Sequence, residues 1–282
     1  MLKQFYILVF LLFSFPISAS SIWHCAHPEL CQLLNEIIQE NKVQNFEVKN
    51  VVQLVGDPHE YEPTSEEIKH LIKVNNLIIG PIELNPWISK IIFQRPKNQS
   101  FKQIELSLKK EDLDLYVSGS KESLSHFWLY PKIYCEFKKS LITNLIKSGV
   151  PVTQITKCEN NATEENLKAV LKKIDFPIIV THDALSPLLK TLSGNPEKII
   201  SLKGSGHHEE INSTSVKKLY QALENKKVLW IKEKNINLPP NIANKMRASD
   251  LIVELDTSST KDKFPFSVLL ELESKIKLIV NR

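Results

Sequence analysis

Residues 176–192 read FPIIVTHDALSPLLKTL, a short apolar run followed at once by an amphipathic stretch. The run at 177–181 is rich in β-branched residues, which is typical of a buried strand, whereas 184–192 has its apolar residues at helical spacing. A strand that leads directly into a helix is the repeating unit of α/β folds with parallel sheets. This stretch therefore predicts an α/β fold.

The same alternation continues in both directions along the chain. Strands are predicted at 21–26, 47–54, 76–79, 102–106, 177–181, 198–202, 227–231 and 251–254. Helices are predicted at 28–39, 65–74, 131–147, 166–174, 184–192, 213–224, 241–248 and 266–275. Thr64 with Glu67 forms a capping-box pattern, and Pro28 suits the first turn of a helix. The regular alternation favours mostly parallel sheets flanked by helices on both faces.

A polar stretch at 159–165, reading ENNATEE, separates these elements into two groups. We expect an N-terminal α/β lobe at 22–158, a connecting helix at 159–174 and a C-terminal α/β lobe at 175–282. Each lobe is expected to hold its own sheet, and a ligand site is expected in the cleft between them.

The first 21 residues, MLKQFYILVFLLFSFPISASS, have the composition of a secretory signal peptide. A membrane anchor is the alternative, but Ser14, Pro16 and Ser18 break the apolar run before the roughly 20 residues that a membrane span needs. We expect cleavage after Ala19 or Ser21. The remaining chain has no second long apolar run, so the protein is expected to be periplasmic or secreted, and soluble.

The formal net charge is +4, and lysines alternate with acidic residues instead of forming a stripe, so nucleic acid is not an expected partner. The four cysteines would face an oxidising compartment, where thiols tend to pair. The shortest loops favour Cys25 with Cys31 and Cys135 with Cys158, although three pairings are possible. The segment HCAHPELC at 24–31 suggests a zinc knuckle, but its spacing does not fit the usual paired ligands.

Three histidines lie beside turns or at the ends of apolar runs in widely separated segments: His59, His126 and His182. Ligands in α/β sheets gather at the carboxyl ends of strands. His182 and Asp256 each follow a predicted strand, and His59 follows another after a Gly-Asp-Pro turn. These residues predict one metal site assembled by the tertiary structure, because imidazole is the commonest metal ligand.

Five segments resemble the periplasmic metal-binding components of zinc and manganese ABC transporters: GDPHEYEPTSEEIKHL (56–71), NLIIGPIELNPWISKI (76–91), SHFWLYPKIY (125–134), THDALSPLL (181–189) and ELDTSS (254–259). The resemblance implies two α/β lobes joined by a helix. It also implies that His59, His126, His182 and Asp256 coordinate one divalent ion, with Glu254 and Asp262 as alternatives for the fourth ligand.

Three imidazoles and a carboxylate suit Zn(II), whereas Mn(II) prefers more oxygen ligands and is the less favoured ion. Four protein ligands leave no open position for a reacting water, and the sequence has no HExxH motif, so an enzyme is not expected. The resemblance implies a monomer that delivers its ion to a membrane permease. A metal-dependent hydrolase and a surface adhesin are the alternatives, and the roles of His27 and of the His207-His208 loop stay open.

Overall fold

The computed structural model describes residues 21–52, 61–82, 84–96, 101–108, 124–153, 161–202, 213–225, 227–234, 238–257 and 266–280. Most of the expected signal peptide lies outside these ranges, as do the following predicted residues: His59, Cys158, His207, His208 and Asp262.

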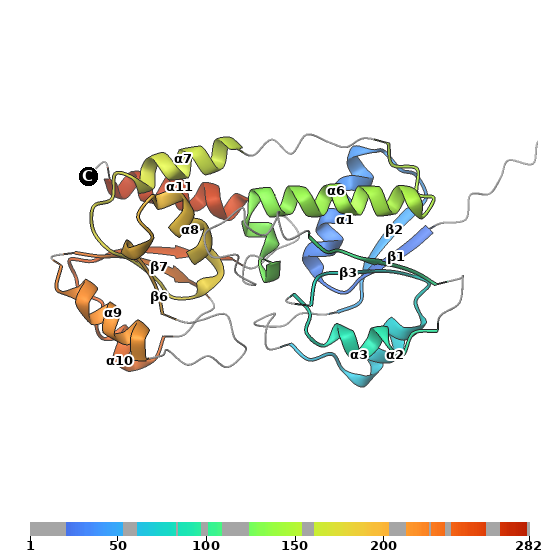
Figure 1. Cartoon of the computed structure of the whole chain (residues 1–282), viewed down its shortest axis with the longest axis horizontal. Helices are drawn as coiled ribbons and strands as arrows, with labels where there is room; N and C mark the ends of the chain where they lie inside the picture. Colours follow the sequence, from blue (N-terminus) through green and yellow to red (C-terminus); the bar gives the residue numbers. More distant parts are fainter. Residues whose placement is uncertain are drawn as a thin grey trace, which may run out of the picture.

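Two parallel sheets form the two ends of the elongated molecule (Figure 1). The first contains β1 (Ser21–Cys25), β2 (Phe46–Asn50), β3 (Asn76–Ile79) and β4 (Lys102–Glu105), in the order β2-β1-β3-β4. The second contains β5 (Ile178–Val180), β6 (Ile199–Ser201), β7 (Leu229–Glu233) and β8 (Leu251–Leu255), in the order β6-β5-β7-β8. All six strand pairings are parallel. The predicted fold class is confirmed, and each sheet repeats the same strand order.

Helices cover both faces of each sheet (Figure 1). On the first sheet, α1 (Pro28–Glu40) and α6 (Pro131–Lys147) cover one face, and α2 (Ser65–Lys73) and α3 (Ile88–Ile92) cover the other. On the second, α7 (Asn161–Leu171), α8 (Ser186–Ser193) and α11 (Ser267–Val280) lie opposite α9 (Ser213–Leu223) and α10 (Pro240–Ala243). The hydrophobic period missed α3, whose five residues are too few to show it, although the family resemblance of 76–91 implied a strand followed by a helix.

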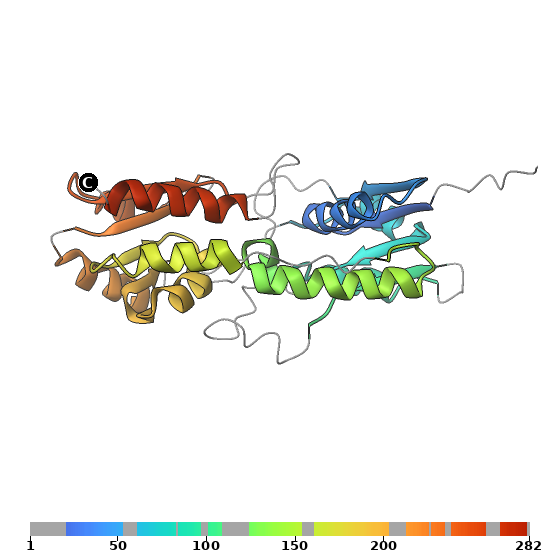
Figure 2. The same ribbon diagram turned by 90° about the horizontal axis from the view of Figure 1, so that it is seen from above.

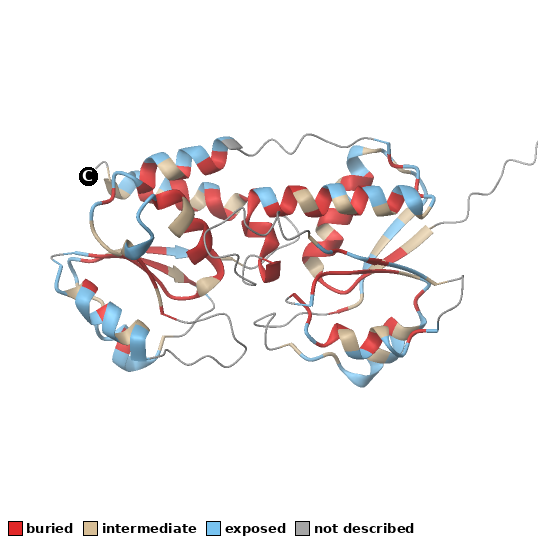
Figure 3. Cartoon of the chain, in the orientation of Figure 1, coloured by how far each residue is buried: buried red, intermediate tan, exposed pale blue. Residues whose placement is uncertain are grey.

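We call residues 21–153 the first half of the molecule and residues 161–280 the second half. One buried cluster of apolar side chains extends through both halves. It includes Ile78 of β3, Ile133 of α6, Ile178 of β5 and Leu269 of α11. Figure 3 shows this buried layer between the sheets and the upper helices. In Figure 2, α6 and α7 follow one another along the long axis. Because the cluster crosses from one half to the other, the two halves are packed together by apolar contacts.

The helix found in the expected connector is α7, which packs on α11 and α8 of the second half. The lobe boundaries stated above stay a prediction. Three 3₁₀ turns complete the described elements: η1 (Phe127–Leu129), η2 (Asp183–Leu185) and η3 (Pro196–Lys198). Within the described ranges, no helix combines the length and the apolar character that crossing a bilayer would need.

Local chemistry explains where α1 and α2 begin. The Glu67 N–H donates to Thr64 Oγ1 at 3.3 Å, and the Thr64 N–H donates to Glu67 Oε2 at 2.7 Å, so the predicted capping box is confirmed. Pro28 occupies the first turn of α1, where its missing N–H costs nothing. The cap of that helix is the side chain of His27, whose Nδ1 accepts from the Glu29 N–H at 3.2 Å.

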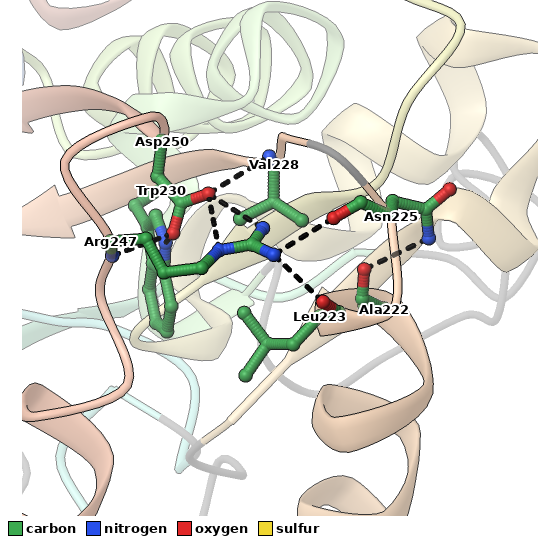
Figure 4. A network of polar contacts seen from close by, with 7 residues as sticks. All are labelled: Ala222, Leu223, Asn225, Val228, Trp230, Arg247 and Asp250. Atoms are coloured by element: carbon green, nitrogen blue, oxygen red, sulfur yellow. Dashed lines mark hydrogen bonds and ion pairs between the residues drawn. The ribbon is translucent and has the colours of Figure 1, made fainter.

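An arginine in each half binds the carbonyl groups at the end of a helix. Arg95 donates to the Leu71 carbonyl, and also to that of Val74 at 2.8 Å, just beyond α2. Arg247 donates to the carbonyls of Leu223 and Asn225, both at 2.8 Å, at the end of α9 (Figure 4). Helix ends expose carbonyls without intrahelical partners, so both side chains satisfy groups that would otherwise be unpaired.

Arg247 differs from Arg95 because it also pairs with a carboxylate (Figure 4). Its Nη2 lies 2.7 Å from Asp250 Oδ1, and Asp250 Oδ2 accepts from Trp230 Nε1 at 3.1 Å. The Val228 N–H adds a further bond to Oδ1 at 3.3 Å. Burial acts to raise the pKa of Asp250, but the bonds from Arg247 and Trp230 outweigh it and hold that pKa below its ordinary value.

The cysteines depart in part from the favoured pairing. Cys25 and Cys31 are both free thiols and buried, so the expected bond between them is absent and that prediction is wrong. They lie close enough for a hydrogen bond, and burial together with this bond raises the pKa of the Cys25 thiol. Cys135 is disulfide-bonded. The thiol pair therefore belongs to the apolar packing between β1 and α1.

Candidate metal centre

Two of the predicted ligands, His126 and His182, meet in the structure. His126 directly precedes η1 in the first half, and His182 is the second residue after β5 in the second half. Their ring centroids are 5.2 Å apart, and the ring planes are inclined at 73°. Both side chains are buried, at 4% and 5% exposure. The fold thus brings imidazoles from both halves into direct contact in a place largely shielded from water.

A buried carboxylate holds the ring of His182. Glu233 is the last residue of β7, the strand that pairs with β5, and its Oε1 lies 3.1 Å from His182 Nδ1. Its other oxygen, Oε2, accepts from Thr257 Oγ1 at 2.5 Å. The Glu233 backbone N–H donates to Thr181 Oγ1 at 3.3 Å. Both carboxylate oxygens and the backbone of Glu233 are therefore held by residues that follow the neighbouring strands β5 and β8.

These hydrogen bonds determine the charge of Glu233. Burial alone would raise its pKa, but the bonds from His182 and Thr257 outweigh burial and hold the pKa below the ordinary value. The carboxylate is therefore ionised at neutral pH and accepts a hydrogen bond from the His182 Nδ1–H. In a neutral imidazole with its proton on Nδ1, the lone pair lies on Nε2. This is the tautomer that binds a metal through Nε2, with a carboxylate behind it.

Trp128 forms a platform beside the histidines. Its ring lies 5.4 Å from that of His126 and 5.6 Å from that of His27, with a 27° inclination to the latter. The indole Nε1–H crosses to the second half and donates to the Thr257 carbonyl at 3.2 Å. A second bond between the halves runs from the Tyr130 hydroxyl to the Ala184 carbonyl at 2.6 Å. The histidine pair is thus flanked by two direct hydrogen bonds between the halves.

The fourth predicted ligand, Asp256, directly follows β8 and is half-buried. Its alternative Glu254 is exposed and pairs with Lys232 at 2.9 Å, so its carboxylate is engaged at the surface. His59 and Asp262 lie outside the described residues. Within the ranges that the structure describes, no set of three or more His, Cys, Asp and Glu side chains could hold a metal ion. The four-ligand site therefore stays a prediction, and Asp256 is favoured over Glu254.

The sequence reasoning missed Glu233. Its signal was the one that pointed to His182 and Asp256: Glu233 lies two residues beyond the apolar run Leu229-Trp230-Ile231, at the carboxyl end of a strand. A charge at that place is costly unless it has partners. Applying the strand-end rule to every polar residue would have identified it.

This chain is similar to known proteins in part of its sequence and in its fold. No family model matches the chain. The manganese ABC transporter substrate-binding lipoprotein ScaA of Streptococcus gordonii is 24% identical over 151 residues, which are 50% of this chain and 45% of the relative. The chain therefore spans less than half of the length of this curated relative.

Solved structures match over nearly the whole chain. The AdcAII protein of Streptococcus pneumoniae superposes with a TM-score of 0.63 at 16% identity, covering 94% of this chain and 99% of that one. A ZnuA deletion mutant with bound zinc gives a TM-score of 0.61 at 16% identity, covering 93% and 97%. The resemblance to the zinc and manganese solute-binding proteins is confirmed. At these identities the structural likeness establishes that the chain has the two-sheet fold of these proteins. It does not identify the metal ligands.

Proposed function

We propose that this chain captures a divalent transition metal ion between its halves and delivers it to the permease of an ABC transporter. The observation that carries the proposal is the contact of His126 and His182, one from each half, with the Glu233 carboxylate behind His182. Imidazole rings backed by carboxylates are the usual arrangement of histidine ligands in metal sites. The names of the manganese ABC transporter substrate-binding lipoprotein ScaA and of the zinc-bound ZnuA mutant agree with a metal cargo.

Zinc is the ion that we propose. His126 and His182 supply nitrogen donors, and the two remaining proposed ligands, His59 and Asp256, add one nitrogen and one carboxylate. Zn(II) accepts such a tetrahedral N/O set, whereas Mn(II) favours oxygen ligands and higher coordination. The relative ScaA is named for manganese, so the ion must be decided by direct competition.

The proposed role is transport, not catalysis. A hydrolytic metal site keeps one coordination position for water, whereas four protein ligands close the coordination sphere of zinc. The first 21 residues are proposed to act as a signal peptide that places the protein outside the cytoplasm, where it works as a monomer. There the permease is the partner that receives the ion.

The test is metal content and affinity with zinc, manganese, copper and nickel offered together. Wild type is compared with alanine variants of the four proposed ligands, His59, His126, His182 and Asp256. The exposed His70 on α2 gives a matched control, His70→Ala. We expect one equivalent of zinc in wild type and in the control, and weakened binding in the four variants. Failure to bind any metal, or equal binding by all variants, would overturn the proposal, and preferential uptake of manganese would overturn its zinc part.

A further inference from the structure

We propose that Thr257 couples the contact between the two halves to the orientation of His182, so that parting the halves loosens this ligand and promotes metal release. The predicted effect on metal release rests on the proposed function. The relay itself, a chain of hydrogen bonds from Trp128 to His182, can be tested without metal.

The relay consists of three consecutive hydrogen bonds. Trp128 Nε1 of the first half donates to the Thr257 carbonyl at 3.2 Å. The hydroxyl of the same Thr257 donates to Glu233 Oε2 at 2.5 Å. Glu233 Oε1 in turn lies 3.1 Å from His182 Nδ1. One residue thus uses its backbone to bind the opposite half and its side chain to bind the carboxylate that holds a proposed ligand.

Burial makes this relay strong. Trp128 is 8% exposed, and Glu233 and His182 are each 5% exposed. Hydrogen bonds to an ionised group in a low-dielectric interior are short and stronger than neutral ones. Thr257 lies two residues beyond the end of β8, where the sheet no longer holds its backbone. The indole of Trp128 therefore helps to set where the Thr257 hydroxyl, and with it the Glu233 carboxylate, can lie.

A second contact between the halves provides an internal comparison. Tyr130 OH donates to the Ala184 carbonyl at 2.6 Å, so this bond ends on the backbone of η2. It holds the halves together without reaching Glu233. If parting of the halves affected the site only through general loosening, the contacts of Trp128 and Tyr130 would be equivalent. The relay predicts that they differ.

The kinetic test is the rate at which zinc leaves the protein when a chelator traps the released ion. Trp128→Phe keeps an aromatic ring but removes the indole N–H, and Glu233→Gln weakens the bond to His182. Loss of a hydrogen-bonding partner of a metal ligand typically changes affinity by about 10-fold to 100-fold. We expect both variants to release zinc faster, with the double variant no faster than Glu233→Gln alone. Tyr130→Phe is the control, and its effect should multiply with that of Glu233→Gln.

Multiplicative effects of Trp128→Phe and Glu233→Gln would overturn the relay, as would an unchanged rate in Trp128→Phe. Thr257→Val, which removes the hydroxyl but keeps the carbonyl, should speed zinc release and show no further effect of Trp128→Phe. Retention of the wild-type rate by Thr257→Val would likewise count against the proposal.

The metal-free test is the ¹⁵N NMR signal of the His182 ring at a fixed neutral pH. We expect wild type to carry its ring proton on Nδ1, and both Trp128→Phe and Glu233→Gln to shift the signals towards exchange between tautomers. Tyr130→Phe should leave the signals in place. If wild type binds no zinc, the proposed function fails, while these spectra still decide the relay. Unchanged spectra in Trp128→Phe would overturn it.

Discussion

Two histidines occupy equivalent places in the two sheets but have different surroundings. His27 is the second residue after β1, and His182 is the second residue after β5, the corresponding strand of the second sheet. Each directly precedes a helical turn. His27 Nδ1 accepts from the Glu29 N–H, whereas His182 Nδ1 faces the Glu233 carboxylate. One ring therefore caps a helix through Nδ1, and the other is held by a carboxylate through Nδ1, which leaves Nε2 for the proposed ligation.

The neighbouring strand explains the difference. Cys25 of β1 is in register with Ile78 of β3, and Val180 of β5 with Ile231 of β7. Two residues further along, the first sheet has Gly80 where the second has Glu233. A Cβ atom at Gly80 would lie 2.5 Å from Leu84 Cδ2, so any side chain there would require the buried Leu84 side chain to shift. The same topology thus produces a capping histidine in one half and a carboxylate-backed histidine in the other.

The largest effect should separate these two histidines. Zinc binding at structural sites is worth about 10 to 16 kcal/mol, so each of four ligands contributes about 3 kcal/mol, or more than 100-fold in affinity. We expect His182→Ala to lose this much affinity and His27→Ala to keep wild-type affinity while losing thermal stability. Competitive zinc titration measures the affinity of both variants and of wild type, and circular dichroism checks that the variants are folded. Loss of zinc binding in His27→Ala would show that the comparison is wrong.

The next effect concerns the Arg247–Asp250 pair of the second half. Asp250→Ala should lower the free energy of unfolding by about 3 kcal/mol at pH 7, because it leaves the half-buried guanidinium of Arg247 and the buried indole N–H of Trp230 without their acceptor. The folded-state pKa of Asp250 lies below its ordinary value, so its contribution is complete above about pH 4 and falls as pH drops through the folded pKa. Urea unfolding at several pH values should show the gap between wild type and variant narrowing in acid.

Arg95 in the first half provides the contrast. Arg95→Ala should lower the free energy of unfolding by about 2 kcal/mol, because the carbonyls of Leu71 and Val74 at the end of α2 lose their donor. Burial lowers the pKa of Arg95, yet a guanidinium stays charged in acid and at neutral pH. The cost should therefore be the same at pH 7 and pH 4, measured by the same urea series. A gap that shrinks in acid as for Asp250 would contradict the assigned contacts.

The smallest effect should come from helix capping. α2 begins with the Thr64–Glu67 capping box, whereas Leu185, the N-cap residue of α8, makes no side-chain capping bond. Thr64→Ala should lower the free energy of unfolding by about 1 kcal/mol, and Thr64→Ser should restore most of it because the hydroxyl is retained. Thermal unfolding of the three proteins measures the difference. Equal stability of Thr64→Ala and wild type would mean that α2 is held by packing alone.

Much of the fold could be predicted from the sequence because its signals are local. All eight strands form at or near their predicted places, since short apolar runs between turn residues need few long-range contacts to be recognised. The capping box and Pro28 at the first turn of α1 could be predicted for the same reason. The five-residue α3 could not be predicted from its hydrophobic period. The free state of Cys25 and Cys31 could not be predicted either, because it depends on the geometry of the two thiols.

The sequence by itself determined the alternation of strands and helices and the strand-end position of His182, since these follow from hydrophobic period and chain order. Only the tertiary structure decided that His126 lies against His182, and that Glu233 and Thr257 stand behind that ring. Their segments lie far apart along the chain, and no local sequence pattern indicates which strands are neighbours in the sheet. Strand order and register place these groups together, and that proximity sets the charge of Glu233 and the tautomer of His182.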